Sequence, residues 1–465
     1  MRAARFAINA LPLALCLSMP AAAQTVLDPR LVVEPVAAGL ELPTAIAFLG
    51  ADDFLVCEKN SGRIKHVVSG AVADVALDLP VNGEATRGLL GLAKHPDFDA
   101  NGFLYVFYSR AAQDGGAWIE NRLSRFAWDG DRILASSEQT LAVFPAAADQ
   151  NNAPACEGGH LRFGPDGLLY GTLGDLGRGG FDNPRIETNT ADAGVAHGGG
   201  IFRLRDDGAA PADNPFAAHA SPEIQRLFAF GVRNSFGLAW DPYSGALWDA
   251  ENGPEVYDEI NLVRPGMNSG WLKLMGPDAR DATYEQNLDT PFDQTDLIEL
   301  PGAHYADPAL SFYEPLGVTS LAFVDGPRFP CDLRGALLLG DFNFGQLYIF
   351  RLNAQRDGLD LPPLVSDGVA DTPEERAAFV FGEGWGVTTA LEYGPDEALY
   401  HVSMTHGAVR RIRQVGPAGD VNFDGVVDLA DVLLTLGSFG RTSQADTDCD
   451  GDTDLIDLAT VLGGL

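Results

Sequence analysis

The sequence predicts an all-β six-bladed β-propeller followed by a small α-helical module. Two observations carry this prediction: a turn-and-strand phrase recurs six times, and two acidic loops of identical spacing close the chain. With 465 residues, 46% of them hydrophobic, the chain can bury a large core.

The first residues are typical of a secretory signal peptide. Arg2 and Arg5 precede a short apolar stretch at residues 11–19, and three alanines end at Ala23. We therefore expect cleavage near Ala23, so that residues 1–23 are removed and the protein is secreted or periplasmic. No later segment is long and apolar enough to span a membrane.

Charge and cysteine content narrow the function classes. A net charge of −34 argues against nucleic acid or an anionic membrane as a partner. Four cysteines remain after cleavage, too few for a disulfide scaffold, and their three possible pairings stay open. They are Cys57, Cys156, Cys331 and Cys449.

The repeated phrase is clearest in "GPDGLLYGTLGD" at residues 164–175, a tight turn followed by a short alternating strand. Six such units favour six antiparallel sheets arranged around an axis, and a pair of β-sandwiches is the alternative. Residues 31–40 could supply a strand that closes the last blade, so the propeller spans 31–413. Related phrases lie at residues 49–67, 95–109, 240–253, 333–352 and 394–413.

After a linker at residues 414–419, two twelve-residue loops place oxygen ligands at EF-hand spacing. Gly425 and Gly451 take the sharp-turn position, and an apolar helix follows each loop. The sequence therefore predicts two calcium sites within residues 420–465, and an ion-free acidic tail is the alternative. The predicted ligands are Asp420, Asn422, Asp424, Val426, Asp428 and Asp431 in the first loop, and Asp446, Asp448, Asp450, Asp452, Asp454 and Asp457 in the second.

Longer phrases show a family resemblance. "RGLLGLAKHPDF", "GGHLRFGPDGLLYGTLGDLGRGG", "FGVRNSFGLAWDP" and "ENGPEVYDEINLVRPGMNSGW" resemble the soluble glucose/sorbosone dehydrogenases across residues 31–413. Active members of that family are six-bladed propellers that oxidise sugars with pyrroloquinoline quinone (PQQ) held beside a calcium ion. The resemblance implies a histidine that takes the sugar hydroxyl proton and an arginine that polarises the acceptor carbonyl.

The family's site residues map onto this chain in part. Arg233, Asn234 and Asp175 match catalytic and cofactor-binding positions, although turn and blade-packing roles fit them equally well. The calcium-holding step and its downstream acids match Gly253, Pro254, Asp258 and Glu259. Neutral residues replace other cofactor contacts, namely Thr86, Asn343, Val387 and Thr389.

The base position is the main departure from the family. In "PACEGGHL" Cys156 stands where the resemblance implies the histidine, and a thiol with a pKa near 8.5 is a poor base for an alcohol. His160, four residues later, is a possible replacement base. A blade-edge cysteine and a satisfied core histidine are the alternative.

The tail resembles a type I dockerin, whose duplicated loop-helix units bind calcium and dock onto cohesin modules. It departs at the positions that read the partner, where Leu429-Ala430 and Leu455-Ile456 replace hydroxylated residues. The resemblance implies a cohesin-like or other extracellular protein partner.

Two functions follow from these patterns. The first is a secreted propeller that oxidises an aldose or related sugar with PQQ and calcium. The second is a non-catalytic propeller that binds carbohydrate or protein and is attached through its tail to a polysaccharide-processing assembly. A glycoside hydrolase is a third possibility, but no supporting carboxylate pair stands out.

Overall fold

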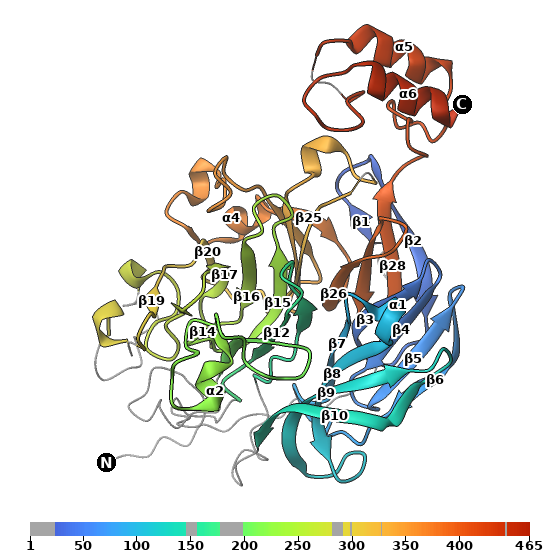
Figure 1. Cartoon of the computed structure of the whole chain (residues 1–465). Helices are drawn as coiled ribbons and strands as arrows, with labels where there is room; N and C mark the ends of the chain where they lie inside the picture. The colour runs from blue at the N-terminus through green and yellow to red at the C-terminus, as the bar shows by residue number, and fades with distance from the viewer. Residues whose placement is uncertain are drawn as a thin grey trace.

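The structure is a computed structural model that describes residues 24–145, 156–176, 199–280, 292–297, 300–326, 328–441 and 444–465. Figure 1 shows the strands of the propeller with two helices of the C-terminal tail standing beside it. The predicted signal peptide, residues 1–23, lies outside the described residues.

Hydrogen bonding joins the strands into six sheets, each of which we treat as one blade. The first blade contains β3 (Pro43–Gly50), β4 (Asp53–Glu58), β5 (Arg63–Val68) and β6 (Ala71–Asp78). The second contains β7 (Leu89–Lys94), β8 (Phe103–Ala111), β9 (Trp118–Trp128) and β10 (Ile133–Pro145). The third contains β11 (Leu161–Phe163), β12 (Leu169–Leu173), β13 (Gly200–Leu204) and β14 (Leu227–Phe230), extended by β18 (Met267–Asn268) and β19 (His304–Tyr305).

The remaining three blades follow in chain order. The fourth contains β15 (Ser235–Trp240), β16 (Leu247–Glu251), β17 (Asp258–Val263), β20 (Leu310–Phe312) and β24 (Val369–Ala370). The fifth contains β21 (Val318–Phe323), β22 (Leu337–Asp341), β23 (Leu347–Phe350), β25 (Val380–Glu383) and β1 (Thr25–Val26). The sixth contains β26 (Thr388–Tyr393), β27 (Leu399–Ser403), β28 (Ala408–Gln414) and β2 (Leu31–Ala38). Three short helices lie in the connections, α1 (Phe98–Asn101), α2 (Pro222–Gln225) and α4 (Pro373–Ala377).

The leading strands of the blades pack side by side in a closed circle. Strand β3 packs on β7, β7 on β11, β12 on β15, β15 on β21, β21 on β26, and β26 again on β3. Such a circle is the geometry of a propeller and excludes a pair of β-sandwiches. The predicted all-β propeller fold is confirmed.

The two ends of the propeller segment pair with each other. Strand β2 runs antiparallel to β28, with register from Leu31 opposite Gln414 to Ala38 opposite Ala408. Its hydrogen bonds join the start of the chain to the last blade, as predicted for residues 31–40. This pairing closes the ring with main-chain hydrogen bonds.

Apolar side chains fill the spaces between the blades. Phe107, Leu161 and Phe202 belong to one cluster between the second and third blades, and Trp248 is fully buried between the fourth and fifth. Each large side chain removed from water contributes on the order of 2 kcal/mol. Packing therefore holds the ring and fixes the ends of the strands, where the candidate site lies.

The tail folds into two helices, α5 (Leu429–Ser438) and α6 (Leu455–Gly464), each preceded by one acidic loop. Asp428 and Asp454 begin the helices, and each side chain accepts a hydrogen bond from a backbone N–H of the first turn. Gly425 and Gly451 have φ values of 97° and 102°, which only glycine adopts without strain. The two units therefore share one backbone design, as their spacing predicts.

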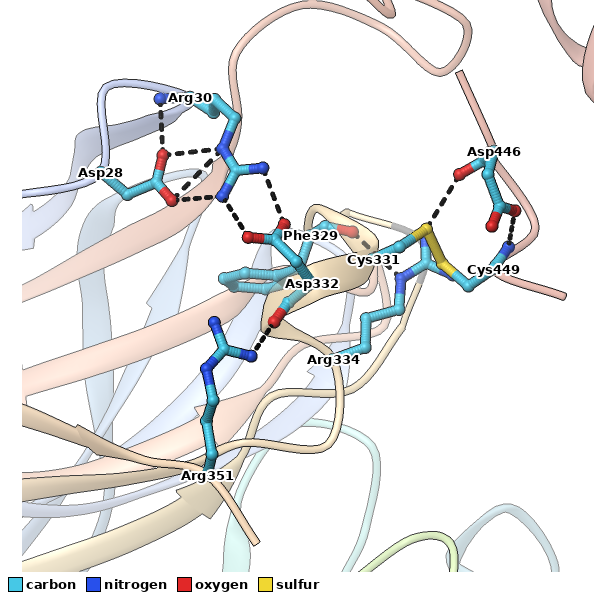
Figure 2. A network of polar contacts seen from close by, with 9 residues as sticks. All are labelled: Asp28, Arg30, Phe329, Cys331, Asp332, Arg334, Arg351, Asp446 and Cys449. Atoms are coloured by element: carbon cyan, nitrogen blue, oxygen red, sulfur yellow. Dashed lines mark hydrogen bonds and ion pairs between the residues drawn. A yellow bond between two sulfur atoms is a disulfide. The ribbon is translucent and has the colours of Figure 1, made fainter. Parts of the chain in front are cut away.

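A disulfide joins the tail to the propeller (Figure 2). Cys331, in the loop after β21, bonds to Cys449 in the second acidic loop across 118 residues of sequence. The Arg334 guanidinium donates to the Thr447 carbonyl oxygen at 3.4 Å beside this bond. Cys57 and Cys156 are free and buried. The pairing that the sequence left open is therefore settled for one bond, Cys331 with Cys449, which joins the propeller to the tail. The other two cysteines are free thiols.

Candidate functional site

The candidate site begins at the turn that leads into β11. Cys156, Gly158 and Gly159 all have positive φ, at 57°, 62° and 103°. The Gly158 N–H donates to Asn234 Oδ1 at 3.1 Å, which ties the third blade to the fourth. A Cβ on Gly174 would lie 2.0 Å from the Cys156 carbonyl oxygen, so glycine is required for this close approach. The turn places Cys156 beside the start of β15.

Asp175 and Arg233 meet at the same end of the blades. The Asp175 N–H donates to the Arg233 carbonyl oxygen at 2.8 Å, and Trp271 Nε1 donates to Asp175 Oδ2 at 3.0 Å. The Arg233 guanidinium lies 5.4 Å from the centre of the Trp271 ring. Asp175, Arg233 and Asn234 are half-buried, so solvent reaches the cluster. The structure thus brings together Asp175, Arg233 and Asn234, the three residues for which the sequence predicts catalytic roles. Trp271 belongs to the same cluster.

The Cys156 thiol lies inside this cluster but is not suited to take a proton. The side chain is 5% exposed. Burial raises the thiol pKa well above its ordinary value, the nearby Asp175 carboxylate raises it further, and Arg233 acts in the opposite direction. A thiol that stays protonated can donate a hydrogen bond to Asp175 but cannot act as a base at neutral pH.

His160 occupies a different environment. It lines a small cavity at the centre of the ring with Thr44, Leu90 and Thr389, and its Nε2 atom has no hydrogen-bond partner within the described residues. Burial, assisted by Arg162, lowers the pKa of His160 to about 3. The imidazole is therefore neutral and faces the ring axis.

A buried charged network next to Cys156 was not predicted from the sequence. The Glu157 carboxylate is 1% exposed, and it accepts from Arg87 Nε at 3.3 Å and from the Asn121 side-chain amide. The Arg87 guanidinium lies 3.9 Å from the centre of the Trp118 ring. This network fixes the turn that carries Cys156. Its only signal in the sequence is a glutamate and an arginine inside otherwise apolar phrases.

Burial gives Glu157 a measurable effect on pH stability. Its pKa is raised to about 7 from 4.5, chiefly by burial, so the folded chain keeps a proton that the unfolded chain releases. The stabilising effect is present below about pH 4.5 and is lost as pH rises through about 7, which costs about 3 kcal/mol. Urea unfolding with EDTA at pH 5 and pH 8 should show this loss, and Glu157→Gln should reduce it. An unchanged pH dependence in the variant would refute the assignment.

The candidate calcium position in the propeller contains a convergent pair of carbonyl groups. Arg233 Nη1 donates to the Asn252 and Gly253 carbonyl oxygens at 2.9 and 2.7 Å, so both oxygens point at one cationic group. Pro254 follows and is half-buried. This pair of carbonyl oxygens suits a cation, and in the structure the Arg233 guanidinium occupies that position.

The two downstream acids bind backbone amides. Asp258 accepts from the N–H groups of Gly253 and Gly317 at 2.9 and 2.6 Å, and burial raises its pKa to about 6. Glu259 accepts from the Gly276 N–H at 2.6 Å and is 1% exposed. In the structure, both carboxylates stabilise loops next to the carbonyl oxygens of Asn252 and Gly253 and do not point toward these oxygens.

The remaining predicted cofactor contacts are dispersed. Thr86 and Asn343 are exposed, and Asn343 Nδ2 donates to the Pro315 carbonyl oxygen at 2.9 Å. Val387 and Thr389 are buried at the start of the sixth blade, where Thr389 Oγ1 donates to the Pro43 carbonyl oxygen at 2.8 Å. None of these four side chains contacts the cluster of Cys156 and Asp175 among the interactions of the described residues.

In both acidic loops of the tail, the carboxylate at the last ligand position accepts hydrogen bonds from backbone N–H groups near the start of the loop. Asp431 accepts from the N–H groups of Val421 and Asn422 at 2.9 and 3.1 Å, and Asp457 accepts from that of Thr447 at 2.5 Å. In the second loop, carboxylate oxygens of Asp446, Asp448 and Asp450 lie within 4.8 Å of one another, and so do those of Asp450, Asp452 and Asp454. Such clusters of hard oxygen ligands fit a calcium ion. In the first loop Asp420 accepts from Gly425 N–H at 2.8 Å, and Val426 is exposed.

Comparisons with known proteins agree with the fold. The family model described as "Glucose / Sorbosone dehydrogenase" matches residues 40–414. The aldose sugar dehydrogenase YliI of Escherichia coli is 27% identical over 323 residues, which cover 68% of this chain and 79% of that protein. Among solved structures, a Thermus thermophilus oxidoreductase described as a glucose dehydrogenase matches with a TM-score of 0.61 at 27% identity, over 82% of this chain and 99% of that one. The PQQ-bound aldose sugar dehydrogenase of Streptomyces coelicolor shares the fold, with a TM-score of 0.58 at 21% identity over 83% and 99%.

The ring and its site therefore define a sugar dehydrogenase-like propeller. Because the family model covers most of the chain, the protein belongs to the glucose/sorbosone dehydrogenase family. None of the described helices is long and apolar enough to cross a membrane.

Proposed function

We propose that this protein is a secreted sugar dehydrogenase that oxidises an aldose or related sugar with PQQ and calcium. The observation that supports it most strongly is the meeting of Asp175, Arg233 and Asn234 beside two convergent carbonyl oxygens. Hydride removal from a sugar requires a cationic group, a carboxylate and a position that binds a metal cation. All three lie together at this half-buried position.

Each residue has a role in this proposal. Arg233 and Asn234 would hold the quinone, and in turning toward it the Arg233 guanidinium would leave the carbonyl oxygens of Asn252 and Gly253 to a calcium ion. Bound PQQ supplies the two-electron acceptor for the sugar. Asp175 accepts the sugar hydroxyl proton, because it is the half-exposed carboxylate beside the protonated Cys156 thiol. Trp271 Nε1 donates to Asp175 Oδ2 and so orients the carboxylate.

A second function, a non-catalytic propeller that binds carbohydrate or protein, is favoured by one observation. Cys156 takes the position of the implied base, and its thiol is buried with a raised pKa. If Asp175 cannot replace the histidine, the same surface still binds its ligand without turnover.

Dye reduction by the purified chain with calcium, PQQ and a panel of aldoses tests the proposal. We expect sugar-dependent reduction, lowered at least about 100-fold in Asp175→Asn, because general base catalysis contributes a factor of that order. Asp166→Asn is a matched control in the same blade, since Asp166 binds Arg203 away from the site. Absence of reduction with every sugar, with no PQQ-dependent rise in Tm, would contradict the proposal and favour the second function.

For the tail, we propose that both loops bind calcium and that the module docks onto a cohesin-like extracellular protein. Support comes from the duplicated loop geometry and from the apolar side chains that α5 and α6 expose. Leu429, Leu433, Leu455 and Ile456 are 67%, 61%, 71% and 56% exposed, which is unusual for leucine and isoleucine unless a partner covers them.

Calcium titration of EDTA-treated protein should reveal two strong sites in the tail. Asp431→Asn and Asp457→Asn remove the last carboxylate of one loop each, and we expect each variant to lose one ion. The double substitution Leu429→Asp, Leu455→Asp should keep both ions but lose calcium-dependent binding to purified cohesin modules. A chain that binds no calcium at these loops, or binds cohesins equally well after both leucines are changed, would contradict the proposal.

A further inference from the structure

Strand β28 carries three arginines whose surroundings differ. Arg411 pairs with Glu34 at 2.7 Å and with Asp396 at 2.9 Å, and Arg413 pairs with Glu34 at 2.5 Å. Arg410 lies opposite His401 on β27, and within the described residues no carboxylate pairs with it. In a chain of net charge −34, an arginine without an acidic partner is unexpected.

Two polar atoms of this cluster, Arg410 Nη1 and His401 Nδ1, are buried and have no hydrogen-bond partner among the described residues. Arg410 Nη2 donates to His406 Nδ1 at 3.2 Å, while Nη1 is buried and has no hydrogen-bond partner within the described chain. His401 is 0% exposed, and its Nε2 lies 3.0 Å from Thr388 Oγ1. Its Nδ1 atom is also buried and unpartnered. Leaving such groups unsatisfied destabilises the folded chain, and a bound partner that pairs with them would remove this cost.

The three titratable side chains of this cluster, Arg410, His401 and His406, are all basic. Burial lowers the pKa of Arg410, and burial together with Arg410 and His406 lowers the pKa of His401 well below its ordinary value. Burial and Arg410 also lower the pKa of His406. Burial is the largest cause of each shift, and no carboxylate among the described residues offsets it.

We propose that Arg410, His401 and His406 form a binding site for a small oxyanion, a carboxylate or phosphate group. The free Nη1 of Arg410 and a neutral His401 N–H supply two donors for two oxygens, the pattern that carboxylate and phosphate groups accept. Trp385 packs edge-on against His401 with ring centres 4.8 Å apart and forms the inner wall. At the outer end of the site, His406 is half-buried and the neighbouring Thr405 is exposed.

The site is distinct from the proposed sugar-oxidising centre. It lies in the sixth blade, where His401 contacts Thr388, whereas Asp175 and Arg233 lie at the third and fourth blades. Its existence does not require turnover or PQQ, so it can be tested on the full chain alone.

Thermal unfolding in low-salt buffer with added acetate or phosphate measures the site. We expect a saturable rise in Tm of about 3 °C when the anion reaches about one hundred times its Kd. Arg410→Gln should abolish this rise, whereas the matched variant Arg411→Gln should keep it on a lower baseline. Saturation by acetate alone assigns a carboxylate site, and saturation by phosphate alone assigns a phosphate site. An equal rise in wild type and Arg410→Gln, or none with either anion, would overturn the proposal.

Soaking crystals of the wild-type protein in selenate, an oxyanion with an anomalous signal, gives a readout that does not depend on folding of the variant. The proposal requires an anomalous peak beside Arg410 Nη1 and His401. Peaks elsewhere on the molecule with none at this position would contradict it.

Discussion

Cys156→His is expected to raise sugar-dependent dye reduction about 100-fold in the presence of PQQ and calcium. The substitution places an imidazole, which burial keeps neutral and so able to accept a proton, where a buried thiol now stays protonated, and a positioned base contributes a factor of this order. Position 156 has a φ of 57°, a conformation that histidine adopts more readily than most residues. Steady-state dye reduction with the best aldose of the panel is the measurement.

Cys156→Ala is the matched control for this gain. It removes the thiol without supplying a base, so its rate should stay near that of the wild type. Cys156→His combined with Arg233→Ala should lose the gain, because the guanidinium no longer contacts the acceptor. A histidine variant that binds PQQ but turns over no faster than the alanine variant would refute the assignment of position 156.

Loss of the disulfide between propeller and tail has the largest expected effect on stability. Replacing Cys331 and Cys449 with serine opens a loop of 118 residues, and closing a loop of this size contributes about 4–5 kcal/mol in the chain-entropy view. We expect the tail of the double variant to unfold at lower urea concentration than in the wild type when calcium is absent. Limited proteolysis should then cleave within residues 444–465.

The control is the reduced wild type. A reducing agent should reproduce the behaviour of the double variant and leave that variant unchanged. Calcium should restore part of the lost stability in both, because ion binding favours the folded loops. Identical urea midpoints for wild type and variant, with and without reductant, would show that the bond contributes nothing.

The contacts around the disulfide explain why the tail stays against the blades. Arg30 pairs with Asp332 at 2.7 Å (Figure 2). The Arg30 guanidinium also lies 5.8 Å from the centre of the Phe423 ring of the first acidic loop. Arg334 reaches Thr447 of the second loop. Both loops therefore contact the propeller, the first at Arg30 just before β2 and the second at Arg334 of the fifth blade.

The fold could be predicted because its signals are local and repeated. Each turn-and-strand phrase reports one blade, and the strand at residues 31–40 pairs with β28 as expected. The helices of the tail begin at Asp428 and Asp454, where the loop spacing places them. Period and turn chemistry are properties of neighbouring residues, which a single sequence displays.

The site could be predicted only in part, because it depends on contacts between distant segments. Asp175, Arg233 and Asn234 were found through short phrases, and Trp271 stands in a quoted phrase but was not singled out. The pairing of Cys331 with Cys449 and the network of Glu157 with Arg87 depend on separations of 118 and 70 residues. Nothing in the local pattern around these residues indicates which partner they meet.

Calorimetric titration of PQQ into the calcium-loaded protein tests the central claim most directly. That claim is that Asp175, Arg233 and the carbonyl oxygens of Asn252 and Gly253 form a quinone-dependent sugar-oxidising site. The account predicts one PQQ per chain, at least about tenfold weaker binding in Arg233→Ala, which removes a charge-assisted contact, and unchanged binding in Arg411→Ala. Saturating PQQ that gives no binding heat and no change in Tm, or equal affinity in Arg233→Ala and wild type, would contradict it.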